Sequence, residues 1–320
     1  MSETLLSNPI FHDEEAAREW LEAQIWAHGR FCPHCGVVDN STLLQGKSHR
    51  PGLYQCNACR EPFTVTVGTL YERSKIPLHK WLAATQLLMA GKKGISSLEI
   101  SRLLGISKKS SWFLMHRIRE SLPPKTLEPV GGEGKSVEAD ETFIGGKEKN
   151  RHRSQRAKAR IGGSWGKESV FSLVEREGKV RSQHVASVSA ETLRPILKGQ
   201  IAADTAFFTD DAGQYRHMKR DFPKHQVVNH GIGEYVRGEA HTNTIEGYFS
   251  ILKRGIVGTY HSVSAQHLKR YLGEFDYRYN EREALKVSDF ERFQKSLPGI
   301  VGRRLTYRRT RGEQENRDQA

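Results

Sequence analysis

The second half of the chain changes regularly between the two-residue period of strands and the 3.6-residue period of helices. Three strand-like segments come first, and helices and strands then alternate as far as residue 280. The predicted strands lie near 137–144, 169–175, 179–188, 205–210 and 225–229, and the predicted helices lie near 190–198, 213–220, 241–254 and 263–280. This order favours a domain of the α/β class, in which helices pack against the faces of one sheet.

Three acidic residues occupy well-defined places in this pattern. Asp140 lies in the alternating run of the first strand, Asp210 ends the fourth strand, and Glu246 lies on the helix that follows. Three strands followed by alternating helix and strand is the order of a ribonuclease-H-like fold, whose first and fourth strands are neighbours at the sheet centre. Carboxylates placed there suit two hard cations, Mg²⁺ or Mn²⁺, held about 4 Å apart for phosphoryl transfer.

The helix around Glu246 argues against a chance arrangement of acids. The sequence has 37 Asp and Glu residues, and we expect most of them to be solvated surface charges. At 100° per residue, however, the helix separates an apolar face from a polar stripe. The apolar face holds Ile245, Tyr248, Phe249, Leu252 and Ile256, and the polar stripe holds Asn243, Glu246, Ser250 and Lys253. A carboxylate, an amide and a lysine on one stripe indicate a site, while Asp211 remains an alternative to Asp210.

All four cysteines of the chain lie in two C-x-x-C pairs, which are Cys32 with Cys35 and Cys56 with Cys59. Each pair places two thiolates on one tight turn, and the 20 residues between the pairs are typical of a structural zinc site. Disulfides are the alternative, but a reducing cytosol disfavours them, and a redox-active pair does not need a second copy. With short strands predicted over 43–54 and 62–68, the pairs predict a zinc ribbon at 31–72, after a helical lead-in at 1–30.

Residues 77–122 have a helical pattern that is interrupted at two turns. Ser96 and Ser107 are predicted N-caps, and Gly105 supplies the tight turn between the second and third helices. Helix, glycine-bearing turn and helix form the helix-turn-helix pattern, which binds DNA through the start of its last helix. The residues placed there are Lys108, Lys109 and Ser110. A plain three-helix packing unit is the alternative, and the basic charge of the chain counts against it.

The chain is strongly basic, with 50 Lys and Arg against 37 Asp and Glu and a formal charge of +13. A surplus of this size suits a polyanion, of which nucleic acid is the commonest. A run predicted to bind DNA beside the Asp140 strand contains Arg151, Arg153, Arg156, Lys158 and Arg160. The remaining boundaries are a linker at 123–135, a catalytic domain at 136–285 and a basic C-terminal tail at 286–320. Without a signal peptide or an apolar run of about 20 residues, the expected location is cytoplasmic, on the nucleoid.

Three motifs of the chain resemble those of one group of bacterial insertion-sequence transposases. They are Phe31-Cys-Pro-His-Cys-Gly36, Val137-Glu-Ala-Asp-Glu-Thr-Phe-Ile-Gly-Gly146 and the segment from His241 to Tyr260. The group combines an N-terminal zinc ribbon, a helix-turn-helix and a DDE catalytic domain of ribonuclease-H-like fold. The resemblance covers most of residues 30–282. It includes the spacing of 35 residues between the second and third acids, which is similar to the D-D-E signature of transposases and retroviral integrases.

The resemblance implies a role for each residue in these motifs. The ligands of the two catalytic Mg²⁺ or Mn²⁺ ions would be Asp140, Asp210 and Glu246. Lys253 would contact DNA near the cut, and the adjacent Arg254 is a further DNA-binding candidate. Because some members of the group use Asn as the third ligand, Asn243 stays open as an alternative to Glu246.

The function that the resemblance implies is DNA transposition. The protein would bind the terminal inverted repeats of an insertion sequence as a homodimer or larger assembly. It would then hydrolyse a phosphodiester at each end and join the freed 3′-hydroxyl to target DNA. Three alternatives remain, namely a non-catalytic zinc-ribbon and helix-turn-helix regulator, a domesticated transposase that binds DNA without cutting it, and a nuclease that hydrolyses without strand transfer.

Overall fold

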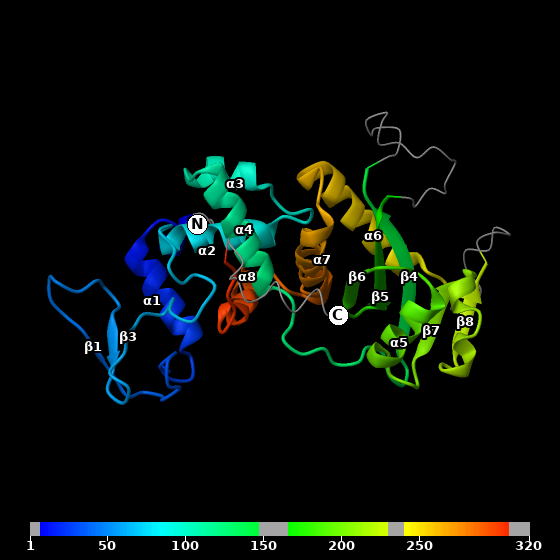
Figure 1. The fold of residues 1–320 in the computed structure, drawn as a ribbon, viewed down its shortest axis with the longest axis horizontal. Helices are drawn as coiled ribbons and strands as arrows, with labels where there is room; N and C mark the ends of the chain where they lie inside the picture. The colour runs from blue at the N-terminus through cyan, green and yellow to red at the C-terminus, as the bar shows by residue number, and fades with distance from the viewer. Residues whose placement is uncertain (1–6, 147–165, 230–239, 307–320) are drawn as a thin grey trace, which may run out of the picture. The chain divides into compact units, whose positions relative to one another are not determined.

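A computed structural model describes residues 7–146, 166–229 and 240–306 of the chain (Figure 1). The chain divides into two compact units. The N-terminal unit comprises Met1–Ala90, Ser96–Leu122 and Asp289–Ala320, and the sheet unit comprises Gly91–Ile95 and Pro123–Ser288. The basic run predicted to bind DNA lies outside the described residues, and its members are Arg151, Arg153, Arg156, Lys158 and Arg160.

The described part of the sheet unit contains one sheet of five strands. The strands are β4 (Ser136–Ile144), β5 (Glu168–Glu175), β6 (Val180–Val185), β7 (Ala206–Asp210) and β8 (His225–Val228). Their order in space is β6-β5-β4-β7-β8. The pairs among β4, β5 and β6 are antiparallel, whereas β7 runs parallel to both β4 and β8. This mixed sheet with its helices is a ribonuclease-H-like α/β domain, so the predicted fold class is confirmed.

Helices cover both faces of this sheet (Figure 1). They are α5 (Ala190–Gln200), α6 (Asn243–Gly255) and α7 (Ala265–Asn280). Successive side chains of a strand point to opposite faces, so β4 contributes to two hydrophobic cores. Val137 packs with Leu193 of α5 in one core, and Ile144 packs with residues of α6 and α7 in the other.

The segment predicted as a helix at 213–220 was wrongly assigned. It forms two short 3₁₀ turns, η5 (Gly213–Tyr215) and η6 (Met218–Arg220). Eight residues gain little from the cooperativity of a longer helix, and burial of Tyr215 and Met218 against the sheet holds the segment instead. Later in the sequence, α6 continues directly into a π-helical turn, η8 (Ile256–Tyr260).

Side chains of α7 cover the free edge of β6. Asn280 donates to the carbonyl of Val180 over 3.0 Å and accepts from its N–H over 2.6 Å. One helical turn earlier, Asp276 accepts from the N–H of Ser182 over 2.7 Å. An uncovered edge would leave a row of backbone groups unpaired, so this contact closes one side of the sheet and fixes α7 to it.

The N-terminal unit begins with a small antiparallel sheet of three strands, β1 (Ser41–Leu43), β2 (Tyr54–Cys56) and β3 (Pro62–Phe63). The predicted strand over 43–54 was therefore wrong in its centre. Gly46 and Gly52 both have positive φ there, which turns the chain between β1 and β2.

The helices of this unit are α1 (Glu14–Ile25), α2 (Leu78–Ala90), α3 (Ser97–Leu104), α4 (Lys108–Ser121) and α8 (Asp289–Ser296). Both predicted N-caps are confirmed, because Ser96 accepts from the N–H of Glu99 and Ser107 accepts from the N–H of Ser110, each over 3.1 Å. Gly105 adopts the left-handed conformation that ends α3, at φ 60°. Among the described residues, no helix has the length and apolar character needed to cross a membrane.

The segment predicted as a basic tail at 286–320 begins with an ordered helix. Arg292 of α8 donates to the carbonyl of Met89 at the end of α2 over 2.7 Å. Phe293 of the same helix is fully buried, with its ring 5.2 Å from that of Trp20 and nearly parallel to it. The tail therefore contributes a helix to the core of the N-terminal unit.

Because His225 is buried, we expect the folded protein to lose stability in mild acid. Burial lowers the pKa of His225 to about 4, and the charge of Lys219 adds to this effect. The folded state keeps the ring neutral while the unfolded chain takes up a proton below about pH 6.5, so stability falls as pH drops toward 4. The free energy of unfolding, measured with a denaturant, should fall by about 2 kcal/mol between pH 7.5 and pH 5 because of this group. His225→Gln should show a correspondingly weaker pH dependence, and an unchanged one would contradict the assignment.

Candidate functional site

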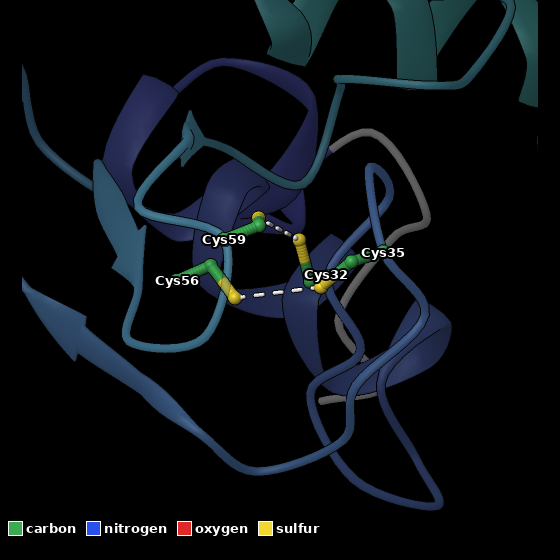
Figure 2. Close-up of side chains that lie close together, drawn as sticks. All are labelled: Cys32, Cys35, Cys56 and Cys59. Atoms are coloured by element: carbon green, nitrogen blue, oxygen red, sulfur yellow. Dashed lines mark hydrogen bonds between the residues drawn. The ribbon is translucent and has the colours of Figure 1, made fainter.

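The four cysteines come together in the N-terminal unit (Figure 2). Their Sγ atoms all lie within 4.8 Å of one another. Across the two knuckles, Cys32 and Cys59 are 3.7 Å apart and Cys35 and Cys56 are 3.6 Å apart. A tetrahedral zinc with Zn–S bonds of about 2.3 Å places its sulfurs about 3.8 Å from one another, whereas a disulfide bond is about 2 Å long. The spacing fits a closed, structural zinc site and does not fit two disulfides.

The backbone of each knuckle is shaped to hold its thiolates. Gly36 donates to the carbonyl of Cys32 and Arg60 donates to that of Cys56, and both donors have positive φ. In the second knuckle, the N–H groups of Cys59 and Ala58 donate to Cys56 and lower the pKa of its thiol to about 6. Since zinc binds the thiolate form, this hydrogen bonding favours the protonation state that the metal needs.

Helix α1, in the predicted lead-in, is joined to the ribbon by side-chain contacts. Glu22 accepts a hydrogen bond from the hydroxyl of Tyr54 in β2 over 3.1 Å. Just after α1, Trp26 packs edge-on against Tyr54 and Phe63. These contacts tie the helix to the strand that leads into the second knuckle.

A second candidate site lies where β4 and β7 pair in parallel. Val137 is opposite Phe207 and Glu138 is opposite Phe208, an offset of 70 residues. Asp140 and Asp210 each lie two residues beyond the last of these pairs, on the two strands that it joins. Both carboxylates are half-buried. The sheet register therefore brings together two acids that are far apart in the sequence.

The charges around Asp140 identify the other members of this site. Burial raises the pKa of Asp140 to about 7, and the negative charges of Asp210 and Glu246 act in the same direction. The N–H of Glu141, 2.7 Å from Asp140 Oδ1, and the positive charge of Lys253 act in the opposite direction. Three predicted acids and the predicted lysine are thus close enough to interact, although they come from β4, β7 and α6.

Local hydrogen bonds orient two of these carboxylates. Asp210 accepts from the N–H of Ala212 over 3.1 Å in the turn that follows β7. Glu246 is exposed in the first turn of α6 and accepts from the hydroxyl of Thr242 over 3.2 Å. Asn243 is exposed one helical turn before Glu246, so the choice of third ligand between them stays open. The alternative acid Asp211 is exposed beside Asp210.

Glu141 belongs to the surroundings of the site and was not predicted. Burial raises its pKa to about 7, and the charges of Asp140 and Asp210 add to that effect. The carboxylate accepts from the hydroxyl of Tyr215 and from the amide of Gln214. Glu141 follows Asp140 directly in a strand, so its side chain lies on the opposite face of the sheet. The alternating sequence pattern could have shown this placement.

The predicted DNA-binding residues within the described parts of the chain lie on helices. Lys108 and Lys109 are exposed in the first turn of α4, and Ser110 is half-buried beside them. Arg254 is exposed near the end of α6 and donates to the carbonyl of Ser250 over 3.1 Å. No contact of these residues tests DNA binding, which stays a prediction for each of them.

A zinc ribbon joined to a ribonuclease-H-like sheet with clustered carboxylates defines a class of nucleic-acid-processing enzymes. Residues 131–280 match the ISXO2-like transposase domain, and residues 12–61 match the transposase zinc-ribbon domain, a match that includes α1. The chain is also 28% identical over 292 residues to "Uncharacterized protein in transposable element ISH50" of Halobacterium salinarum. That alignment covers 87% of this chain and 96% of the relative. The predicted resemblance to insertion-sequence transposases that carry an N-terminal zinc ribbon is therefore confirmed.

Removal of one zinc ligand should unfold the ribbon. We expect the purified chain to hold about one zinc per molecule and Cys56→Ser to lose it, because three thiolates bind zinc far more weakly than four. The zinc released by a thiol-reactive agent measures the metal content. Limited proteolysis around residues 31–61 measures unfolding of the ribbon. His34→Ala, an exposed residue in the first knuckle, is the matched control and should keep its zinc. A zinc content that stays at about one in Cys56→Ser would exclude the four-cysteine site.

Proposed function

We propose that this protein is a DNA transposase that cleaves the ends of its insertion sequence and joins them to target DNA with the help of divalent metal ions. The observation that carries the proposal is the electrostatic cluster of Asp140, Asp210, Glu246 and Lys253, assembled from two strands and a helix. The transposase family supplies the reaction class, and this cluster supplies a place where the reaction can occur.

The donor atoms of the cluster fit hard cations. Asp140, Asp210 and Glu246 offer carboxylate oxygens, which Mg²⁺ and Mn²⁺ prefer, and the cluster contains no thiolate among its described members. The negative charges of Asp210 and Glu246 raise the pKa of Asp140, so a bound divalent cation would relieve repulsion that the protein itself leaves in place. Such ions, when bound, lower the pKa of a water and stabilise the charge that develops on a phosphodiester.

The protein's own residues would position DNA at these carboxylates. Lys253 follows Glu246 by seven residues, which on a helix is about 20° short of two full turns, so both side chains share one side of α6. A lysine there is suited to bind a DNA phosphate next to the metal site. Arg254 is adjacent and exposed, and it extends the positive charge along the helix.

Recognition of the DNA ends is proposed for the N-terminal unit. The start of α4, with Lys108, Lys109 and Ser110, has the position of a recognition helix in a helix-turn-helix. The zinc ribbon would add contacts to the same terminal inverted repeats. Cutting two ends together requires two active sites, so we propose a homodimer or larger assembly on DNA that acts in the cytoplasm on the nucleoid.

Substitution of the proposed metal ligands should abolish both chemical steps. On labelled duplexes carrying the flanking ends, wild type with Mg²⁺ or Mn²⁺ should give nicked and joined products. Asp140→Asn, Asp210→Asn and Glu246→Gln should each lower the cleavage rate at least about 100-fold, because each removes charge from the metal site. Asp211→Asn is the matched control and should cleave at nearly the wild-type rate. Asn243→Ala, compared with Glu246→Gln, decides which of the two is the third ligand.

The same assay separates the alternatives. Nicked products without joined products from the wild type would identify a nuclease that lacks strand transfer. Specific binding of the ends without cleavage in either metal would identify a regulator or a domesticated transposase. A fully active Asp140→Asn variant would show that the proposed cluster is not the catalytic centre.

Loss of positive charge at the start of α4 should weaken DNA binding in a salt-dependent way. Each phosphate contact removed lowers the slope of log affinity against log salt by about 0.9. The double variant Lys108→Ala/Lys109→Ala should therefore lose up to about 2 from that slope, measured by fluorescence anisotropy with terminal-repeat DNA. Lys179→Ala, in the exposed turn between β5 and β6, controls for net charge. Equal slopes for the double variant and wild type would favour the plain packing unit.

A further inference from the structure

A second acid on β4 is buried completely, two residues before Asp140 and on the same side of the strand. Glu138 is 0% exposed. Its Oε1 accepts from Arg176 Nε over 2.7 Å and from the Thr244 hydroxyl over 2.8 Å, and its Oε2 accepts from the N–H of Ile245 over 3.0 Å. His241 Nδ1 lies 3.3 Å from Oε1. A carboxylate with this many donors is a fixed point in the fold rather than a group that exchanges ligands.

Glu138 takes the place of a missing cap on α6. The first N–H groups of a helix need acceptors from outside the helix, and a residue just before it usually supplies one. The residue in that position, Thr242, makes no side-chain cap bond to the backbone and donates to Glu246 instead. The acceptor comes from β4, and its negative charge also suits the positive end of the helix dipole. The start of α6 is therefore fixed to the strand that carries Asp140.

Arg176 extends this connection to β7. Its guanidinium donates to Glu138 and to the carbonyl of His241 over 2.9 Å, and it lies 4.4 Å from the centre of the Phe208 ring. Phe208 precedes Asp210 by two residues, in the same way that Glu138 precedes Asp140. The backbone N–H of Arg176 donates to the carbonyl of Ser136, so the arginine is also anchored to β4.

The ion pair of buried Glu138 and half-buried Arg176 thus contacts all three elements that carry the clustered acids. On each element the contact falls within two residues of the acid: at Glu138 for Asp140, at Phe208 for Asp210 and at Ile245 for Glu246. Buried ion pairs add little net stability, because desolvation offsets most of their attraction. Directional hydrogen bonds, however, fix the position of the partners to fractions of an ångström, which apolar contacts do less well.

We propose that Glu138 is a positioning residue that holds Glu246 in register with Asp140 and Asp210, so that the three carboxylates can bind divalent metal together. The proposal rests on the function proposed above for that cluster. Glu138 does not contact the metal or DNA, and it acts through the start of α6. Residues that hold metal ligands in this way typically contribute 10- to 100-fold to metal affinity or activity.

The test measures Mn²⁺ binding to the full-length protein by electron paramagnetic resonance, in parallel with the rate of cleavage. Glu138→Gln keeps the size of the side chain and should raise the Kd for Mn²⁺ about tenfold or more. The cleavage rate at saturating DNA should fall while the KM for DNA stays within about twofold of wild type, since the substituted residue does not touch DNA.

Two further variants separate position from stability. Glu274→Gln is a matched control, because Glu274 is also 0% exposed and paired with an arginine, Arg278 of α7. It should lower the melting temperature and leave the Kd for Mn²⁺ unchanged. The double variant Glu138→Met/Arg176→Met removes both charges of the pair together. It should be more stable than Glu138→Gln but should bind Mn²⁺ no more tightly.

The outcomes distinguish failure of the inference from failure of the proposed function. If Asp140→Asn binds Mn²⁺ as tightly as wild type, the carboxylate cluster is not the metal site, and the proposed function fails at that point. If Asp140→Asn loses Mn²⁺ while Glu138→Gln or the double Met variant binds it like wild type, the cluster stands and Glu138 has no positioning role. If Glu138→Gln weakens Mn²⁺ binding no more than Glu274→Gln does, the effect is general destabilisation and the inference is likewise overturned.

Discussion

The parallel pairing of β4 with β7 is the constraint on which the rest of the sheet unit depends. It places β4 at the centre, between an antiparallel neighbour and a parallel one, so hydrogen bonds hold the strand on both edges. Asp140 and Asp210 each lie two residues beyond the end of that pairing, and the charge of Asp210 acts on Asp140. A side chain on a central strand moves less than one on a loop, which would suit the proposed metal site.

Under the proposed function, the chain would separate two kinds of metal chemistry by the donor atoms it offers. Four thiolates at tetrahedral spacing leave no position for a substrate, so the ribbon site can serve structure alone. The carboxylates around Asp140 are fewer, partly exposed and mutually repelling. Under the proposed function, such a site would bind a hard cation and leave coordination positions for water and phosphate. Soft and hard donors in separate units reduce the risk that zinc occupies the carboxylate site.

Features encoded within a few residues were predictable from the sequence, and features that depend on long-range contacts were not. Local spacing determines the cysteine knuckles, the serine caps and the succession of strands and helices along the sequence. The structure contains all three. The α8 helix was missed because charged residues surround its apolar Phe290 and Phe293. Nothing close to Glu138 in the sequence distinguishes it from the other acids of β4, because its partners Arg176 and Ile245 are 38 and 107 residues away. Only the folded chain shows which acids of β4 are paired.

Glu138 and Asp140 show how one strand uses the same chemistry for two purposes. Both are acids on the same side of β4, yet Glu138 is surrounded by donors and Asp140 faces the negative charges of Asp210 and Glu246. Full pairing at the first position makes the carboxylate a structural group, and incomplete pairing at the second leaves charge that a cation can neutralise. The repulsion around Asp140 costs stability, and such local conflict is expected where function requires it.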